Sequence, residues 1–171
     1  LNNQKEIIEM FSKYLPADTI LIVKEHKVSI GRRNIHFYKE INNLYNVHFV
    51  SHQTDVYSLL EMSQGVITIS SSMGLEAIML NKAVITVGDI HYNILSQVIK
   101  ARDFSKISEY IKIANNFVCY DEVEYWSFMK TITSNCYRMP GYSPHQYKEE
   151  HVDTFVEMIE DIEKAIVINV K

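Results

Sequence analysis

The sequence predicts an α/β protein in which a Rossmann-like parallel sheet, flanked by helices, is followed by a helical C-terminal tail. Short apolar runs alternate with stretches of helical periodicity, which is typical of consecutive βαβ units. The runs are almost continuously apolar, as in strands that helices cover on both faces. Their short connections favour right-handed crossovers and therefore parallel strands. The runs are TILIVK (19–24), NVHFV (46–50), GVITIS (65–70) and AVITVG (83–88).

Length and composition indicate one globular domain. The 171 residues are 47% hydrophobic and 22% charged, and the net charge of −4 comes without a basic block, which argues against nucleic acid as a partner. No apolar run approaches the roughly 18 residues of a membrane span. Cys119 and Cys136 are expected to be reduced thiols in the cytoplasm. Because the chain opens without Met in a helical pattern, we expect residues 1–171 to be a single lobe of a longer, two-lobe protein.

Helices are expected before and between the apolar runs. Apolar residues at helical spacing predict a first helix over residues 7–15, which Pro16 ends. A second helix is expected around residues 38–45. Thr54 or Asp55 is expected to cap a third helix, because short polar side chains satisfy the first free N–H groups of a helix.

The second half of the chain is expected to become mainly helical. A fourth helix, GLEAIML (74–80), lies between the last two apolar runs. From Tyr92 onward the pattern is helical, so residues 92–171 are predicted to form a helical tail of the same lobe, broken near Pro140. The last helix of this tail carries an apolar stripe. The stripe consists of Val152, Phe155, Ile159, Ile162 and Ile166.

Three consecutive serines, Ser70, Ser71 and Ser72, stand where the third apolar run turns into the next helix, and we call this segment the serine turn. In open α/β sheets, ligands bind beyond the carboxyl ends of the strands, where helix N-termini offer free N–H groups to phosphate. The serine hydroxyls are therefore candidate phosphate contacts. Gly74 would let the chain approach a ligand closely, and Glu76 lies one turn into the helix, within reach of ribose hydroxyls.

The same residues also fit a purely structural interpretation. Ser71 or Ser72 can serve as the N-cap of the helix, a role worth about 1 kcal/mol, while the other serines fill a tight turn. Glu76 then only complements the positive end of the helix. A serine-rich turn is a weaker signal than a glycine-rich phosphate loop, so spacing alone leaves both interpretations open.

The stretch from Leu21 to about Tyr92, which includes LIVKEHK, NVHFVSHQTD and VITISSSMGLEAIML, resembles the capsular polysaccharide biosynthesis family. The resemblance covers a little under half of the chain. It implies a GT-B fold, of which this chain would be the C-terminal, donor-binding lobe. Characterised members of the family are glycosyltransferases that transfer Kdo from its CMP-activated form onto capsule or lipid-linker acceptors.

Two motifs carry the resemblance. Lys24 and His26 match a Lys-x-His-Pro element that ends the first strand of the lobe and implies contact with the nucleotide phosphate and base. Ser71 and Ser72 match the phosphate-binding serines that open the later helix. Glu76 matches the acidic residue that holds the ribose or cytidine side of the donor.

Lys27 departs from the family pattern, which prefers proline after the histidine. Proline would stiffen the turn, so without it the direction in which the His26 side chain points stays open. The role that the resemblance implies for His26 is a hydrogen bond to the donor phosphate, which would stabilise charge on the departing nucleotide. The general base is expected in the N-terminal lobe of the same protein, and this chain alone is therefore expected to bind nucleotide without turnover.

Six further residues are secondary candidates for donor binding. Arg32 and Arg33 would neutralise a phosphate or a sugar carboxylate, although an exposed arginine pair is more often simply solvated. The other four follow the second and fourth apolar runs and so lie at the same predicted edge. They are His52, Asp89, His91 and Tyr92.

No metal and no cofactor are expected. The histidines are scattered and lack the His-x-x-x-His and HExxH spacings of metal sites. The expected substrate is a nucleotide sugar, a CMP-sugar by the resemblance or a UDP-sugar as the alternative, and the acceptor is a glycan or a glycolipid. The full-length protein is expected in the cytoplasm, with peripheral association at the inner face of the cytoplasmic membrane as a further expectation.

Two rival functions stay open. An epimerase of the UDP-N-acetylglucosamine 2-epimerase type shares the fold, but usually carries Ser-Gly-Gly followed by paired glutamates, whereas this chain has SSMGLEA with Glu76 alone. A non-catalytic lobe kept for assembly with other capsule proteins is the second rival. Preference for uridine diphosphates over CMP would favour the epimerase or a transferase that uses a UDP-sugar, and absence of nucleotide binding would favour the assembly lobe.

Overall fold

The computed structural model describes residues 4–26, 29, 31–136 and 156–157. The chain separates into two units, residues 1–125 and 126–171, and the first holds every predicted site residue. The apolar stripe predicted from Val152 to Ile166 and the predicted break at Pro140 lie outside the described residues, apart from 156–157.

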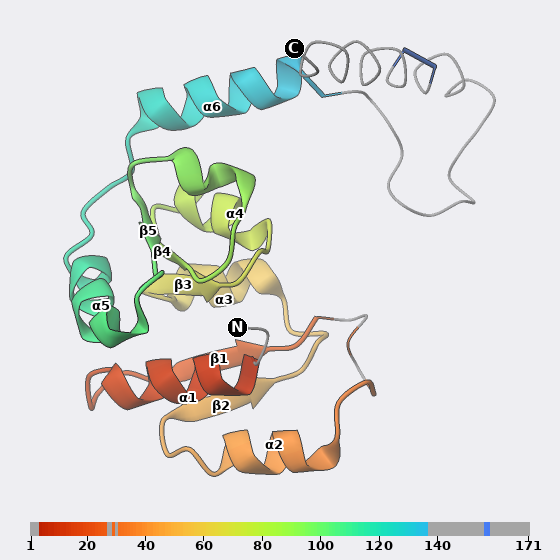
Figure 1. Cartoon of the computed structure of the whole chain (residues 1–171), viewed down its shortest axis with the longest axis vertical. Helices are drawn as coiled ribbons and strands as arrows, with labels where there is room; N and C mark the ends of the chain where they lie inside the picture. The colour runs from red at the N-terminus through yellow and green to blue at the C-terminus, as the bar shows by residue number, and fades with distance from the viewer. Residues whose placement is uncertain (1–3, 27–28, 30, 137–155, 158–171) are drawn as a thin grey trace, which may run out of the picture. The chain divides into compact units, whose positions relative to one another are not determined.

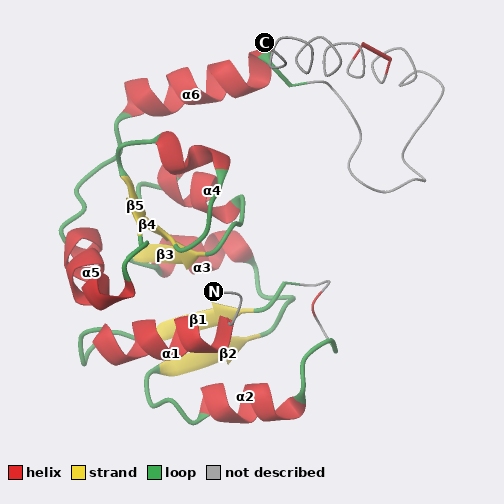
Figure 2. Ribbon diagram, viewed as in Figure 1, coloured by secondary structure: helices red, strands yellow, loops and turns green. Residues whose placement is uncertain are grey.

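Within the described residues, five strands form two parallel ladders (Figure 2). In the first, Leu21 of β1 lies opposite Val47 of β2. In the second, Thr68 of β3 lies opposite Thr86 of β4, which also pairs with β5. The strands are β1 (Leu21–Lys24), β2 (Val47–Val50), β3 (Gly65–Thr68), β4 (Ala83–Thr86) and β5 (Val98–Lys100). The predicted α/β class with parallel strands flanked by helices is confirmed.

Helices alternate with the strands from α1 to β5, and η3, α5 and α6 follow β5 (Figure 1). The α-helices are α1 (Gln4–Tyr14), α2 (Ile35–Asn42), α3 (Val56–Met62), α4 (Met73–Met79), α5 (Ile107–Asn115) and α6 (Glu122–Ser134). The short 3₁₀ turns that the described residues include are, among others, η2 (His91–Ile94) and η3 (Phe104–Lys106). Among the described residues, no helix combines the length and apolar character that crossing a membrane requires.

Two helices, α2 and α3, begin at residues whose side chains cap them. Asp55, one of the two predicted caps, accepts a hydrogen bond from the backbone N–H of Ser58 at 2.7 Å and begins α3. Asn34 accepts from the N–H of His36 at 3.0 Å and begins α2. Between β1 and α2 the chain turns through Gly31, whose φ of 75° lies in the left-handed region that glycine adopts without a steric penalty.

One apolar core joins the two ladders. Ile7 and Phe11 of α1 pack with Ile85 of β4 and with Ile107 and Ile111 of α5. Partly buried side chains from the strands complete this core, and they include Leu21, Ile67 and Ile99. Both ladders therefore depend on the same buried contacts.

The structure corrects two details of the predicted strands. Residues 98–100 form β5, whereas the sequence predicted only helix from Tyr92 onward; three residues are too few to show a strand period. The third and fourth strands end at Thr68 and Thr86 rather than at Ser70 and Gly88. The whole serine turn therefore lies beyond the carboxyl end of β3.

Candidate functional site

Lys24 and His52 connect the carboxyl ends of β1 and β2. Lys24 Nζ donates a hydrogen bond to the backbone carbonyl oxygen of His52 at 2.7 Å. Hydrogen bonds from Ser58 hold the pKa of Asp55 below its usual value, and the charge of Lys24 lowers it further. His26 and His52 are both exposed at this edge. The structure thus brings together Lys24 and His52, which the sequence predicts at the same edge.

Arg33, a predicted anion ligand, is already engaged by Glu25. Its Nε lies 2.6 Å from Glu25 Oε1, and its Nη2 donates to Gln4 Oε1. The guanidinium group also stacks on Phe37, 4.6 Å from the ring centroid. The second carboxylate oxygen of Glu25 accepts from the hydroxyl of Tyr38 at 2.5 Å, a bond that raises the pKa of Tyr38. Sequence reasoning missed Glu25.

Arg32 is exposed beside this cluster. Its backbone N–H donates to the carbonyl oxygen of Ser29 at 3.1 Å, and the N–H of Ser29 donates to the carbonyl oxygen of His26 at 2.8 Å. These two hydrogen bonds connect the backbones of His26 and Arg32 through Ser29.

The serine turn is held by local hydrogen bonds. Thr68 Oγ1 accepts from the N–H of Ser71 at 3.0 Å, and Ser71 Oγ accepts from the N–H of Met73 at 3.2 Å. Ser72 occupies the N-cap position of α4, where its side chain makes no capping hydrogen bond. Ser71 and Ser72 are both exposed, beyond the carboxyl end of β3.

Tyr92 supports this turn from inside the protein. Its side chain is fully buried, and its hydroxyl donates to the carbonyl oxygen of Ser71 at 2.5 Å. Burial raises the pKa of Tyr92 to about 12. A Cβ atom on Gly74 would lie 2.2 Å from the same hydroxyl, so glycine is required here by the tyrosine. The structure therefore gives Gly74 and Tyr92 an internal contact, and the ligand contacts that the sequence predicts for them stay predictions.

Glu76 lies half-buried in the first turn of α4. Its charge is one of three causes that raise the pKa of Tyr125, after burial of the phenol and the charge of Tyr120.

Asp89 and His91 follow β4 at the same edge. Asp89 forms an ion pair with Arg102, whose guanidinium also donates to the carbonyl oxygen of Val87 at 3.0 Å. His91 is exposed and meets the Tyr92 ring edge-on, with 5.4 Å between ring centroids. Arg102 follows β5, and sequence reasoning missed it because it missed that strand.

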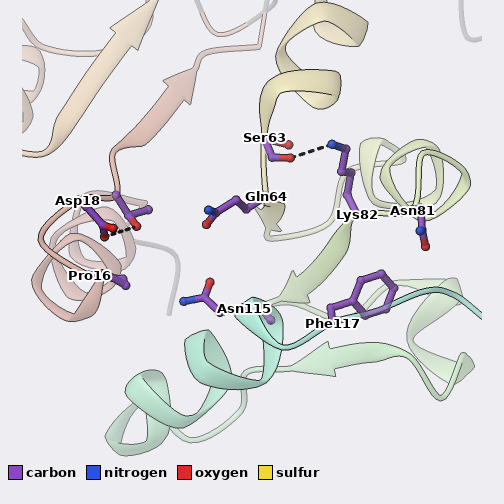
Figure 3. A pocket seen from close by; sticks show the side chains of 10 residues that line it. Pro16, Asp18, Ser63, Gln64, Asn81, Lys82, Asn115 and Phe117 are labelled. Carbon is purple, nitrogen blue, oxygen red and sulfur yellow. Dashed lines mark hydrogen bonds between the residues drawn. The ribbon is translucent and has the colours of Figure 1, made fainter.

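An open pocket of about 540 Å³ lies at the opposite, amino edge of the strands (Figure 3). Residues that precede β1, β3 and β4 line it, among them Asp18, Gln64 and Lys82. Lys82 has a structural role, because its Nζ donates to the carbonyl oxygens of Glu61 at 2.7 Å and Ser63 at 2.9 Å. None of the predicted site residues lines this pocket.

The described residues include no group of three His, Cys, Asp or Glu side chains arranged to hold a metal ion. The groups at the carboxyl edges are instead hydroxyls, histidines and paired charges. These groups can donate hydrogen bonds to an oxyanion, and the exposed serine hydroxyls need no rearrangement of the core to do so.

A family model described as capsule polysaccharide biosynthesis protein matches residues 2–97. No curated protein and no solved structure matches the chain. The matched segment runs from before α1 to just before β5, and it includes the serine turn and the polar residues that follow β1, β2 and β4. It spans more than half of the 171 residues, so the chain belongs to the capsule polysaccharide biosynthesis family.

Proposed function

We propose that this chain is the donor-binding lobe of a glycosyltransferase in capsule or surface polysaccharide synthesis, and that its donor is a CMP-activated sugar. Family membership supports the role in capsule synthesis. The resemblance of the Lys24–His26 and Ser71–Glu76 segments to donor-binding motifs supports the finer assignment. UDP-sugars are the alternative donors.

The exposed serine turn is the observation that carries the proposal. Thr68 and Tyr92 fix the backbone of Ser71 from inside the protein, while the side chains of Ser71 and Ser72 remain exposed. A turn that is rigid inside and polar outside suits recognition of a phosphate, because little conformational entropy is lost on binding. Ligands of open α/β sheets bind at this edge.

The proposed chemistry is displacement of the nucleotide by an acceptor hydroxyl. His26 donates a hydrogen bond to the donor phosphate and stabilises the charge that develops on the departing nucleotide. Ser71 and Ser72 hold the phosphate, and Glu76 accepts hydrogen bonds from the ribose. Removal of the proton from the acceptor requires a general base, which we assign to an N-terminal lobe of the full-length protein. The glycan or glycolipid acceptor binds between the lobes.

The proposal is tested by titrating the chain with CMP, UMP and UDP, using calorimetry or ligand-observed NMR. We expect CMP to bind, and we expect Ser72→Ala, His26→Ala and Glu76→Ala each to weaken binding by about tenfold, as loss of a hydrogen bond to a charged group predicts. Ser63→Ala is the matched control, because Ser63 lies at the amino edge. Absence of binding by all three nucleotides would contradict the proposal.

The choice of nucleotide separates the remaining alternatives. Clear preference for UDP over CMP would favour a UDP-sugar transferase or the epimerase. Equal CMP affinity in the wild type and in all three site variants would mean that the nucleotide binds elsewhere on the chain. The serine turn would then have only a structural role at the start of α4.

A further inference from the structure

The end of β1 is fastened to its neighbours by two consecutive side chains. Lys24 binds the carbonyl oxygen of His52 after β2, and Glu25 binds Arg33 and Tyr38. Lys24 is the last residue of β1, and Glu25 follows it directly. The backbone is therefore held by two successive side chains immediately before His26.

Glu25 makes the stronger of these two attachments. Its two oxygens bind different partners, Arg33 Nε at 2.6 Å and the Tyr38 hydroxyl at 2.5 Å. The side chain of Glu25 is 14% exposed and that of Arg33 is 25% exposed. Exposed ion pairs contribute little, whereas a shielded carboxylate with two donors makes strong, charge-assisted hydrogen bonds.

Arg33 is oriented as an anchor for Glu25. Its guanidinium lies over the Phe37 ring and also donates to Gln4 of α1. These contacts join the end of β1, the segment before α2, and α1. Between Glu25 and Arg33 lie His26 and Arg32, whose backbones are linked through Ser29.

We infer that Glu25 is a positioning residue for the donor site: by binding Arg33 and Tyr38 it fixes the chain that follows β1 and so places His26. The inference rests on the proposed function, because it concerns the same donor site. It assigns a role to the middle residue of the Lys-x-His segment, and it assigns Arg33 to the support of the site rather than to the ligand.

Glu25→Gln distinguishes this role from direct binding by Arg33. If Glu25 positions the chain, the substitution weakens CMP binding by about tenfold, because the charge-assisted bond to Arg33 is lost. If Arg33 were itself a ligand, removing its competing carboxylate would strengthen CMP binding. The two roles therefore predict opposite signs for one substitution.

A second measurement needs no nucleotide. Hydrogen exchange of the Arg32 and Phe37 amides reports on the segment between β1 and α2 and on the start of α2, since Arg32 donates to the carbonyl oxygen of Ser29 and Phe37 donates to that of Asn34. We expect Glu25→Gln to speed their exchange by about tenfold, while the amides of β4 keep their wild-type rates. If Glu25 only contributed to global stability, the substitution would speed exchange both of the Arg32 and Phe37 amides and of the β4 amides.

Glu40→Gln is the matched control. Glu40 of α2 binds Lys5 of α1 at 2.7 Å, so the variant also removes a carboxylate that joins these helices, but at an exposed position. It is expected to leave both the CMP affinity and the exchange of Arg32 unchanged.

Each outcome decides one claim. Unchanged exchange of Arg32 and Phe37 in Glu25→Gln would overturn the inference whether or not nucleotide binds. Faster exchange with unchanged or stronger CMP binding would also overturn it. If the wild-type chain binds no nucleotide, the proposed function fails, and the exchange measurement still decides whether Glu25 fixes the chain after β1.

Discussion

At the scale of single residues, several side chains that the sequence predicts as ligand contacts form hydrogen bonds to other residues of the site. Lys24 binds a backbone oxygen after β2, Arg33 binds Glu25, and Tyr92 binds the backbone of Ser71. A lysine ammonium retains further donors after one bond, so this role of Lys24 is compatible with contact to a phosphate. The buried phenol of Tyr92 has its hydroxyl inside the protein, and its effect on the site acts through Ser71.

The phenol of Tyr92 predicts a loss of stability in alkali. Its pKa is raised to about 12 in the folded protein, against about 10 in the unfolded chain. Between these values the folded state binds more protons, so the free energy of unfolding falls as pH rises. We expect this contribution to be fully present below pH 10 and to lose roughly 2 kcal/mol as the pH passes 12, measured by urea denaturation across this range.

Tyr92→Phe isolates that contribution. The variant is expected to be less stable than the wild type at pH 8 by about 1 kcal/mol, because the bond to the Ser71 oxygen is lost. The difference should shrink and then reverse as the pH rises above 10, since phenylalanine has no proton to lose. Parallel curves for the two proteins between pH 9 and pH 12 would contradict the raised pKa.

At the scale of elements, the start of α4 depends on a contact between Gly74 and η2. Alanine in a helix is favoured over glycine by about 1 kcal/mol, but its Cβ would lie 2.2 Å from the Tyr92 hydroxyl and 2.6 Å from the ring carbon that carries it. Overpacking of a core costs about 1–3 kcal/mol. We therefore expect Gly74→Ala to lower the free energy of unfolding, measured by urea denaturation.

Gly31→Asn is the comparison for this variant. Gly31 has a φ of 75°, and a Cβ atom at this position would meet no other atom within 4 Å. Asparagine tolerates this backbone conformation better than most residues do. The substitution should therefore change stability much less than Gly74→Ala. A gain of stability in Gly74→Ala would show that Tyr92 moves aside without cost.

The elements differ in how well the sequence could predict them. The apolar runs of β1 to β4 are local signals, so periodicity was sufficient to predict them, and side-chain type narrowed the cap of α3 to Thr54 or Asp55, of which the structure has Asp55. The start of α4 was predicted less well: Ser72 occupies the cap position, but the bonding is done by Thr68 and Ser71. Three neighbouring hydroxyls compete there, and only the backbone path decides between them.

The supporting contacts of the site could not be predicted from the sequence. Glu25 and Arg33 are separated by a loop, and Tyr92 lies 21 residues from Ser71. Such pairs depend on how β1 and α2, or β3 and η2, come together in the fold. The positions of the serine turn and of His26 were accessible because they follow directly from strand ends, whereas Arg102 required knowledge of β5.

At the scale of the unit that residues 1–125 form, one core supports both ladders. Phe11 of α1 is 1% exposed and belongs to the cluster that also contains Ile85 of β4 and Ile107 of α5, with Leu21 of β1 packed against it. The carboxyl ends of β1 and β3, which carry His26 and the serine turn, are therefore fixed by shared apolar contacts. A donor that bound both segments would depend on this core for its geometry.

Phe11→Ala tests whether the two ladders unfold together. Loss of a buried phenylalanine costs about 3–5 kcal/mol, and because the core is shared, we expect amide exchange to accelerate by a similar factor in β1–β2 and in β3–β4–β5. Tyr45→Ala is the control, because this side chain is 77% exposed. It should change the free energies of opening that amide exchange reports for the two ladders by no more than about 0.5 kcal/mol. If acceleration were confined to the β1–β2 ladder, the two ladders would be separate folding units. His26 could then be displaced without disturbing the serine turn, and the donor site would have to be assembled by the ligand.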